Sequence, residues 1–474
     1  MSRALARIRE AFAGPGGTSE VLRVSYPLIL SHLSFTLQTF VDRVFLTWYS
    51  PEAIAGAVAG LFITWAVVGL FVAVGEYVTT FVAQYHGAQR PERIGPAVWQ
   101  GIYFAAGAGV LMAALAPSLH SVFDWAGHDP KVREHEVRYA SLLMAGGFPV
   151  VLMATLASYF AGRGKTLVIL RVNVLVTLVN VVLDYLWIFG LLGFPRAGVA
   201  GAAAATIAAE AVGASVYLAL MLRAEDRRLR ATLSGWRFDR ALFSRLVRYG
   251  LPSGLHWAIE ILGFGVFLLI VGRIGTLELA ATGMAFNLNG LVFVPMLGLG
   301  VGVTSIVGRY IGAGRPELAE RSTWSAIGIS FAYMTVWGLF YFLAPLLLLA
   351  PYRAGANPAE FAPLEALTAV LLRFVAVYSI FDMLNVVCAA ALRGAGDTVF
   401  AMWSSTFFAL FAMLLPTYVA VTFFGSGIYT AWTAASAYVF GVGTLLFFRF
   451  RRGRWKSLRV IERAPVRALE AETA

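Results

Sequence analysis

Six carboxylate side chains stand inside long apolar stretches of this 474-residue chain. They are Asp42, Glu76, Asp184, Glu210, Glu260 and Asp382. A charged side chain at the centre of a bilayer costs about 2.5–3.5 kcal/mol on insertion scales, so such residues are rare there and mark ion or proton pathways. The residue type therefore predicts that these acids bind a proton or a small cation inside a membrane.

Four of the six acids form two pairs that are matched in depth. Asp42 and Asp184 are equally far along the chain from the nearest basic residue on the cytoplasmic side, as assigned below. At a rise of about 1.5 Å per residue, both would stand about 28 Å up, in the outer half of the bilayer. Glu260 and Asp382 lie closer along the chain to their nearest cytoplasmic basic residues, at nearly equal separations. This places both acids about 17 Å from the cytoplasmic surface of the membrane, near the middle of the bilayer.

Other oxygen-bearing side chains share a helical face with these acids. Asn180 stands four residues before Asp184, and Tyr378 stands four residues before Asp382. Residues four apart lie on one face of a helix. These oxygen-rich faces suit a proton or Na⁺.

The alternative is that the acids are structural. An acid inside a span could pair with an intramembrane arginine, such as Arg43 beside Asp42, or Arg373. This alternative also stays open for Glu76 and Glu210.

The elements that must position these acids are membrane-spanning helices. Hydrophobic residues make up 59% of the chain and charged residues 13%, against about 25% charged residues in soluble proteins, and the mean hydropathy is +0.75. A spanning helix needs about 20 mainly apolar residues, and lipid cannot satisfy free backbone polar groups. We therefore expect an all-α integral membrane protein with twelve transmembrane helices. The windows are 24–48, 53–83, 97–119, 138–160, 167–191, 198–222, 248–272, 279–308, 323–349, 365–391, 399–424 and 428–449.

The basic residues predict the topology. Arginine and lysine gather in alternate loops, so the positive-inside bias places both termini in the cytoplasm of a multi-pass plasma-membrane protein. The net charge of +11 reports this topology, and we expect no nucleic-acid partner. The basic linker and tail are expected to contact anionic membrane lipids. The single cysteine, Cys388, excludes an intramolecular disulfide.

One loop sequence occurs twice. VAQYHGAQRPERIGPAVW (82–99) aligns without a gap with VGRYIGAGRPELAERSTW (307–324). Each copy follows the second span of its half, so the chain is predicted to form two pseudo-symmetric six-helix lobes of the same orientation with a transport site between them. The predicted segments are a cytoplasmic lead-in over 1–22, an N-lobe over 23–222, a linker over 223–247, a C-lobe over 248–450 and a tail over 451–474.

The later parts of the halves also correspond, but the acids do not. GRGKT (162–166) aligns with GAGDT (394–398) at a slightly larger offset, and we interpret both as tight turns between helices. Asp42 aligns with Phe267, and Glu260 aligns with Phe35. The acids therefore make the two halves different.

Several segments together resemble the multidrug and toxic compound extrusion (MATE) transporter family over essentially the whole chain. They are FVDRVFL (40–46), VAQYHGA (82–88), VNVVLDYLWIFG (179–190), GVAGAAAAT (198–206), LPSGLHWAIE (251–260), AFNLNGLVFVP (285–295) and YSIFDMLNVVCAAALRGAGDT (378–398). The resemblance implies two six-helix lobes in a V, and alternating access driven by a proton or Na⁺ gradient. It also implies organic cations and amphipathic drugs as substrates.

The resemblance assigns cation-coupling residues in both lobes. In the N-lobe it implies Asp42 with Asn180, Asp184 and Thr206, the cation site of one branch of the family. In the C-lobe it implies Glu260, Tyr378 and Asp382, which match the bacterial drug and sodium branch, and Asn287 in span 8. Possible additional site residues are Glu76, Glu210 and Arg43. Thr282 and Gly283 replace the His-Gln that often starts span 8, so the branch, the coupling ion and the substrate stay open.

The function expected from the sequence is a cation-coupled antiporter, with H⁺ or Na⁺ as the ion, that exports small organic compounds as a monomer without a cofactor or a bound metal. One alternative is a lipid-linked oligosaccharide flippase, which would favour a cationic cavity. The only basic residues that could line such a cavity are Arg43, Arg171 and Arg373. A polytopic membrane enzyme is a second alternative, but the six histidines are scattered and form no catalytic constellation.

Overall fold

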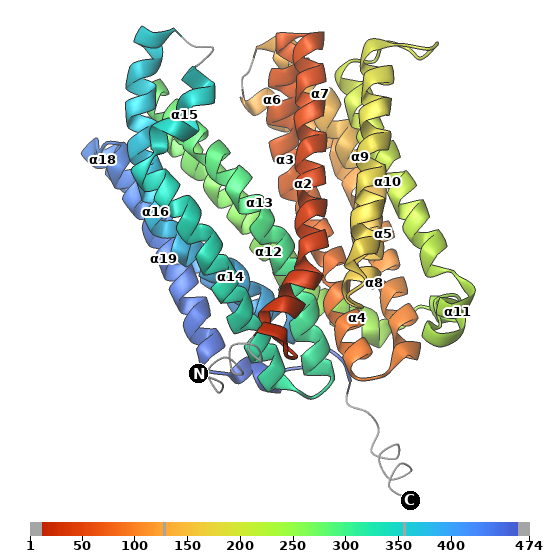
Figure 1. Ribbon diagram of the computed structural model, residues 1–474. Coiled ribbons are helices and arrows are strands. Elements are labelled where there is room, and N and C mark those ends of the chain that lie inside the picture. The colour runs from red at the N-terminus through yellow and green to blue at the C-terminus, as the bar shows by residue number, and fades with distance from the viewer. Residues whose placement is uncertain (1–11, 127–128, 354–356, 463–474) are drawn as a thin grey trace, which may run out of the picture.

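The chain folds almost entirely into helices. Figure 1 shows the computed structural model, which describes residues 12–126, 129–353 and 357–462. No strand occurs in these three segments. Residues 1–11 of the predicted lead-in, and residues 463–474 of the predicted tail, lie outside the described residues.

The helices gather into two lobes. The N-lobe contains α2 (Thr18–Tyr49), α3 (Pro51–Glu76), α4 (Val78–Gly87), α5 (Ile94–Leu115), α6 (Leu119–Ala126), α7 (Pro130–Ala145), α8 (Gly147–Ala161), α9 (Thr166–Phe189) and α10 (Val199–Met221). The short α11 (Ala224–Arg230) follows it. The C-lobe contains α12 (Arg240–Val271), α13 (Thr276–Gly312), α14 (Pro316–Leu343), α15 (Pro345–Arg353), α16 (Pro358–Ala395), α17 (Thr398–Phe408), α18 (Leu415–Phe424) and α19 (Ile428–Arg451).

The expected count of twelve spans is not confirmed. Among the described residues, ten helices are long and apolar enough to cross a membrane, and the bent pair α7–α8, with a 48° break, makes up to eleven. The remaining predicted span, 24–48, lies within α2. This helix has 32 residues but is not among the helices that are both long and apolar enough to cross a membrane. Polar residues such as Gln38 and Asp42 on α2 lower its hydropathy.

Local sequence explains where several helices begin. Ser50 accepts a 3.0 Å hydrogen bond from the backbone N–H of Ala53, and Pro51 fills the first helical position of α3. Asp239 caps α12 in the same way by accepting from the N–H of Leu242. As a result, the last part of the predicted linker 223–247, from residue 240 onward, belongs to α12.

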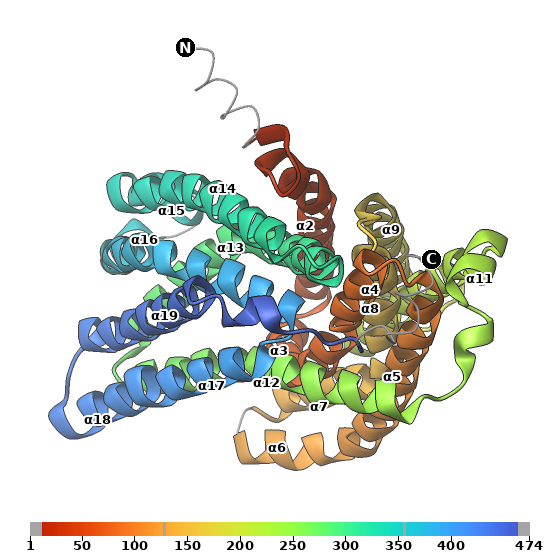
Figure 2. The ribbon, with the colours of Figure 1, turned by 90° about the horizontal axis from the view of Figure 1, so that it is seen from below.

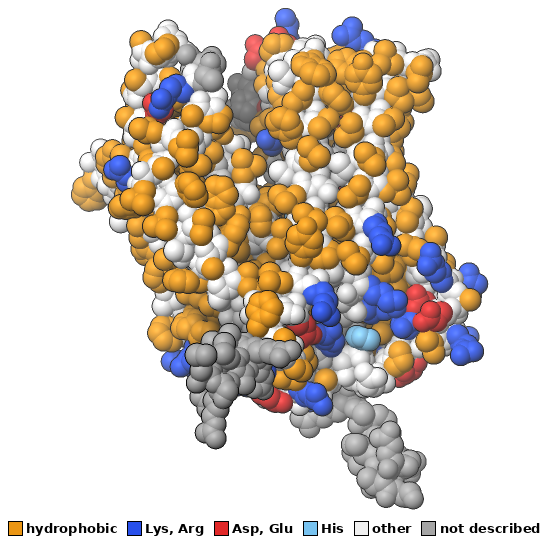
Figure 3. All heavy atoms as spheres, viewed as in Figure 1, with side chains coloured by type: hydrophobic (Ala, Val, Ile, Leu, Met, Phe, Trp, Pro, Cys, Tyr) orange, Lys and Arg blue, Asp and Glu red, His pale blue; other side chains and the backbone are white. Residues whose placement is uncertain are grey.

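The two lobes diverge from a shared base in a V. Seen from below in Figure 2, α2–α10 and α12–α19 form separate groups that meet near α3, α4, α12 and α13. Both ends of the described chain lie on this face, which we call the terminal face (Figure 1). Hydrophobic side chains cover most of the side view in Figure 3, and basic side chains gather toward the terminal face. This pattern is that of a membrane-embedded protein.

The repeated loop lies where the lobes cross. A Cβ at Gly87 of α4 would overlap the carbonyl oxygen of Arg309, and a Cβ at Gly312 of α13 would overlap that of Gln84. Gly87 and Gly312 occupy equivalent positions in the two copies of the loop. The two copies therefore pack against each other, and only glycine allows this approach.

Two hydrogen bonds at this crossing are also symmetric: each lobe donates one to the other from an equivalent residue. Thr80 Oγ1 donates to the carbonyl oxygen of Arg393 at 3.3 Å, and Ser305 Oγ donates to that of Ala161 at 2.6 Å. Thr80 and Ser305 are equivalent in the alignment of the repeated loop, and Ala161 and Arg393 directly precede the two aligned glycine turns. The duplicated sequence thus builds a symmetric junction of the lobes at the terminal face.

We expect Gly312→Ala to destabilise the protein by about 1–3 kcal/mol, because the added methyl group overlaps a backbone that cannot yield easily. The unfolding temperature in detergent should fall. Gly328→Ala is the matched control, since a Cβ on this α14 glycine would meet nothing within 4 Å. Equal unfolding temperatures for the two variants would contradict the close crossing.

Candidate functional site

A cavity with a mainly apolar lining and several polar side chains lies in the N-lobe among α2, α3, α7, α8, α9 and α10. Its polar lining includes Gln38, Asp42, Tyr139, Asn180, Thr206 and Glu210. Tyr139 donates a 3.5 Å hydrogen bond to Asp42 Oδ2, and Asn180 Nδ2 donates to Thr206 Oγ1 at 3.5 Å. These long bonds hold the side chains loosely.

Four buried oxygen atoms around this cavity have no hydrogen-bond donor. They are Asp42 Oδ1, Asn180 Oδ1 and both carboxylate oxygens of Asp184. Asp184 is fully buried (0% exposed) on the same helix as Asn180, and its charge acts on that of Asp42. An unsatisfied buried acceptor costs about 1–3 kcal/mol, and more when it is charged. A proton or an oxygen-preferring cation would satisfy this cluster of acceptors.

The acids of the C-lobe are better supplied with donors. Glu260 of α12 accepts a 3.2 Å hydrogen bond from Asn385 Nδ2 of α16, and His256 Nε2 lies 3.6 Å from its Oε1. His256 Nε2 also lies 2.7 Å from Ser405 Oγ of α17. Asp382 stands near enough to Glu260 for the two charges to repel each other. The structure therefore brings the two acids together and adds His256 and Asn385.

A small cavity lies between this group and the terminal face. Ser253, His256, Arg393 and Thr398 provide its polar lining. Buried His256 thus borders this cavity on one side and Glu260 on the other. Among the residues that the structure describes, no three His, Cys, Asp or Glu side chains come together in a way that could hold a metal ion.

A family model described as MatE matches residues 27–186 and 252–419, which span both halves of the chain. The chain belongs to the MATE family. It is therefore a multi-pass membrane transporter, which argues against the membrane-enzyme alternative.

Relatives of this MATE transporter are similar over nearly their whole length. The probable multidrug resistance protein NorM of Thermotoga maritima is 26% identical over 452 residues, which cover 95% of this chain and 96% of that protein. The multidrug resistance protein NorM of Burkholderia vietnamiensis is 28% identical over 437 residues, covering 91% of this chain and 93% of that protein.

Solved MATE structures share the fold. One, described as the outward-facing conformation of a multidrug resistance MATE family transporter, has a TM-score of 0.83 at 21% identity and covers 96% of this chain and 98% of its own. A structure described as a MOP superfamily transporter from Pyrococcus furiosus, with a binding pocket of reverse polarity, has a TM-score of 0.82 at 21% identity and covers 94% of this chain and 97% of its own. The predicted all-α fold, with two lobes arranged in a V, is thereby confirmed.

Three residues named from the sequence lie outside these two groups. Asn287 is exposed and accepts a 2.9 Å hydrogen bond from Tyr352 of α15. Glu76, at the end of α3, interacts electrostatically with Arg393 of the other lobe. Arg43 is exposed, and no ion pair joins it to Asp42 in the described part of the chain.

Several contributors to these MATE sites were not predicted from the sequence. Tyr139, Asn385 and Ser405 each bond a site residue from another helix. His256 stands four residues before Glu260, a spacing that places both on one helical face, so this signal was present in the sequence.

Proposed function

We propose that this protein exports small organic, cationic or amphipathic compounds in exchange for H⁺ or Na⁺ by alternating access. The observation that carries the proposal is the set of four donorless oxygen atoms of Asp42, Asn180 and Asp184. The names of the NorM relatives support a drug-like substrate.

The chemistry of these atoms favours an exchangeable cation. Buried carboxylates are retained where a proton or cation compensates their charge. A bound cation would satisfy the acceptors in one conformation, and substrate would favour the other. Exchange then follows from linkage, because each ligand shifts the equilibrium only if it binds one state better than the other.

The lining of the N-lobe cavity separates this proposal from a lipid-linked oligosaccharide flippase. Its ionisable acids are Asp42 and Glu210, and no arginine or lysine lines it among the described residues. A cavity with this negative charge suits a cation better than an anionic pyrophosphate. The Glu260–Asp382 group in the C-lobe gives a second site of the same sign, suited to an organic cation.

We further propose that the terminal face is cytoplasmic and that the protein lies in the plasma membrane as a monomer. Positive side chains concentrate on this face (Figure 3), in line with the positive-inside bias. The junction of the lobes at this face corresponds to a state closed on the cytoplasmic side.

The direct test uses purified protein in liposomes loaded with a fluorescent organic cation. A pH gradient and a Na⁺ gradient are imposed separately, and the release of the dye is followed. We expect one gradient to drive transport, which identifies the coupling ion. Failure of both gradients, together with flipping of a fluorescent lipid-linked sugar by the same preparation, would reject the antiporter in favour of the flippase.

A further inference from the structure

The chain that follows α19 crosses from one lobe to the other on the terminal face. We call residues 454–462 the C-terminal strap. Figure 2 shows this segment leaving α19 and running across the face toward the N-lobe. Within the described chain it follows the last helix of the C-lobe, and both of its ends are anchored.

The first half of the strap belongs to the C-lobe. Trp455 is fully buried in the hydrophobic core of that lobe, and its Nε1 donates a 2.8 Å hydrogen bond to the carbonyl oxygen of Phe450. Lys456 Nζ forms a 2.6 Å ion pair with Glu320 of α14. This half therefore moves with α14 and α19.

The second half is packed into the N-lobe. Val460 (1% exposed) and Ile461 belong to the hydrophobic cluster of Tyr77 and Phe81. The backbone N–H of Val460 donates a 3.0 Å hydrogen bond to Gln84 Oε1. Gln84 Nε2 in turn donates to the carbonyl oxygen of Gly394 in the C-lobe at 3.0 Å. The strap thus lies directly over the junction of the two lobes.

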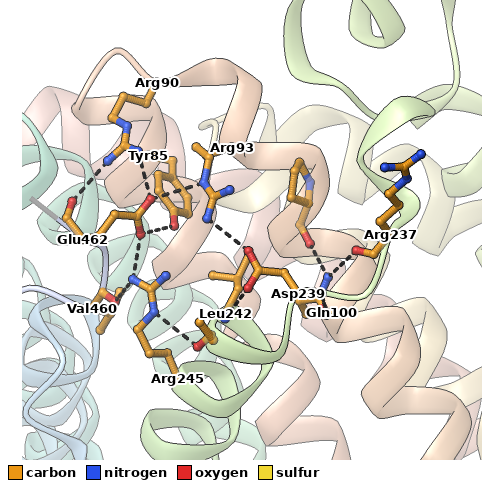
Figure 4. Close-up of polar contacts among 12 residues, drawn as sticks. Tyr85, Arg90, Arg93, Gln100, Arg237, Asp239, Leu242, Arg245, Val460 and Glu462 are labelled. Carbon is orange, nitrogen blue, oxygen red and sulfur yellow. Dashed lines mark hydrogen bonds and ion pairs between the residues drawn. The ribbon is translucent and has the colours of Figure 1, made fainter. Parts of the chain in front are cut away.

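Glu462 ends the strap in a cluster of three arginines (Figure 4). From the N-lobe, Arg90 Nη2 approaches Oε1 at 2.9 Å and Arg93 Nε at 3.2 Å. From α12 of the C-lobe, Arg245 Nη1 approaches Oε2 at 2.7 Å. The hydroxyl of Tyr85 donates a further 2.8 Å hydrogen bond to Oε2. One carboxylate, which follows the last helix of the C-lobe, therefore neutralises two cations of the N-lobe and one at the start of α12, where Leu242 and Leu246 pack in the N-lobe cluster. These cations would repel each other without it.

We propose that the C-terminal strap is a lock that keeps the terminal face closed and must undock before that face can open. The inference rests on the proposed alternating access for its role in transport. The lock itself is defined by contacts between the lobes, which any opening of this face must break: the Glu462 cluster, the buried Val460 and Ile461, and the Gln84 bridge. Hydrogen bonds to charged groups are stronger than neutral ones, which makes Glu462 the point at which to release it.

The ionisation of Glu462 shows that the lock is not a sensor of physiological pH. Partial burial disfavours its charge, but the hydrogen bonds from Arg245 and Tyr85 outweigh this and hold the pKa of the Glu462 carboxyl at about 2, below its usual 4.5. The facing charged groups are Arg90, Arg93 and Arg245, with Asp239 paired to Arg93. Because the pKa is lowered, the stabilisation is complete above about pH 4.5 and is lost only as the pH falls toward 2.

The test measures the distance between the lobes at the terminal face without any gradient or substrate. The only cysteine, Cys388, is replaced by alanine, and spin labels are placed at two exposed positions, Glu92→Cys in the N-lobe and Glu317→Cys in the C-lobe. Double electron–electron resonance then gives the distribution of distances between the two labels. We expect one short distance in the parent protein, unchanged between pH 5 and 8, and a second, longer distance in Glu462→Arg.

Glu225→Arg is the matched control, since it makes the same change at an exposed acid of this face in α11. It should keep the short distance alone. Val460→Asp provides a second way to release the strap, because it places a charge in the buried cluster and leaves Glu462 in place. If folded Glu462→Arg and Val460→Asp both keep the parent distance, the strap is not a lock. Because the readout needs no transport, this result is distinct from failure of the antiporter assay.

Discussion

Asp184→Asn is expected to reduce gradient-driven export to the background leak, while the protein still folds and inserts. Both carboxylate oxygens of Asp184 are buried without a donor, so the proposed cation is their missing partner. Asparagine keeps the shape but removes the charge. Removing one partner of a buried charge interaction costs about 3–5 kcal/mol, which corresponds to at least about a hundredfold loss of cation affinity. The measurement is dye export from liposomes under the effective gradient.

Stability provides a control for this variant. A neutral amide lacks the desolvation cost of a buried carboxylate, so the unfolding temperature of Asp184→Asn should equal or exceed that of the parent protein. Asp42→Asn should behave in the same way, since Asp42 carries the neighbouring charge. Glu134→Gln changes an exposed acid of the same lobe and should export normally. Full export by both Asp184→Asn and Asp42→Asn would overturn the N-lobe assignment.

Asp382→Asn is expected to abolish gradient-driven export of an organic cation and to weaken its binding by on the order of tenfold, or about 1.4 kcal/mol. The charge of Glu260 is already shared with Asn385 and His256. Asp382 also interacts with Asn385, but no ion pair holds its carboxylate in the described part of the chain, so it can bind a positive substrate. Fluorescence polarisation of the dye gives the binding constant, and the liposome assay gives the export rate.

The comparison between lobes makes this experiment informative. Glu317→Gln, at an exposed position of the C-lobe, is the control and should leave both measurements unchanged. We expect Asp184→Asn to lose the dependence on the ion while still binding dye, and Asp382→Asn to lose dye affinity. Unchanged dye affinity in Asp382→Asn, with normal export, would show that the C-lobe acids only support the structure.

The fold of this protein could largely be predicted from its sequence. The long apolar stretches dictate helices because lipid offers no partner for the backbone, and the repeated loop dictates two similar halves. The count of twelve spans was not reached, because α2 combines its apolar residues with polar ones such as Gln38 and Asp42 that serve the cavity. The prediction was therefore weakest where the chain carries its site.

The sequence determined which residues could do the chemistry, because an acid inside an apolar helix is costly enough to signal a role by itself. It paired Asp42 with Asp184 and Glu260 with Asp382 by depth. Only the tertiary structure decided what surrounds them. Asp184 is left without donors, whereas Glu260 accepts a hydrogen bond from Asn385 of another helix. The strap was likewise not predictable, because Glu462 and Arg90 stand 372 residues apart in the sequence. Such contacts depend on how helices cross, which periodicity and hydropathy do not specify.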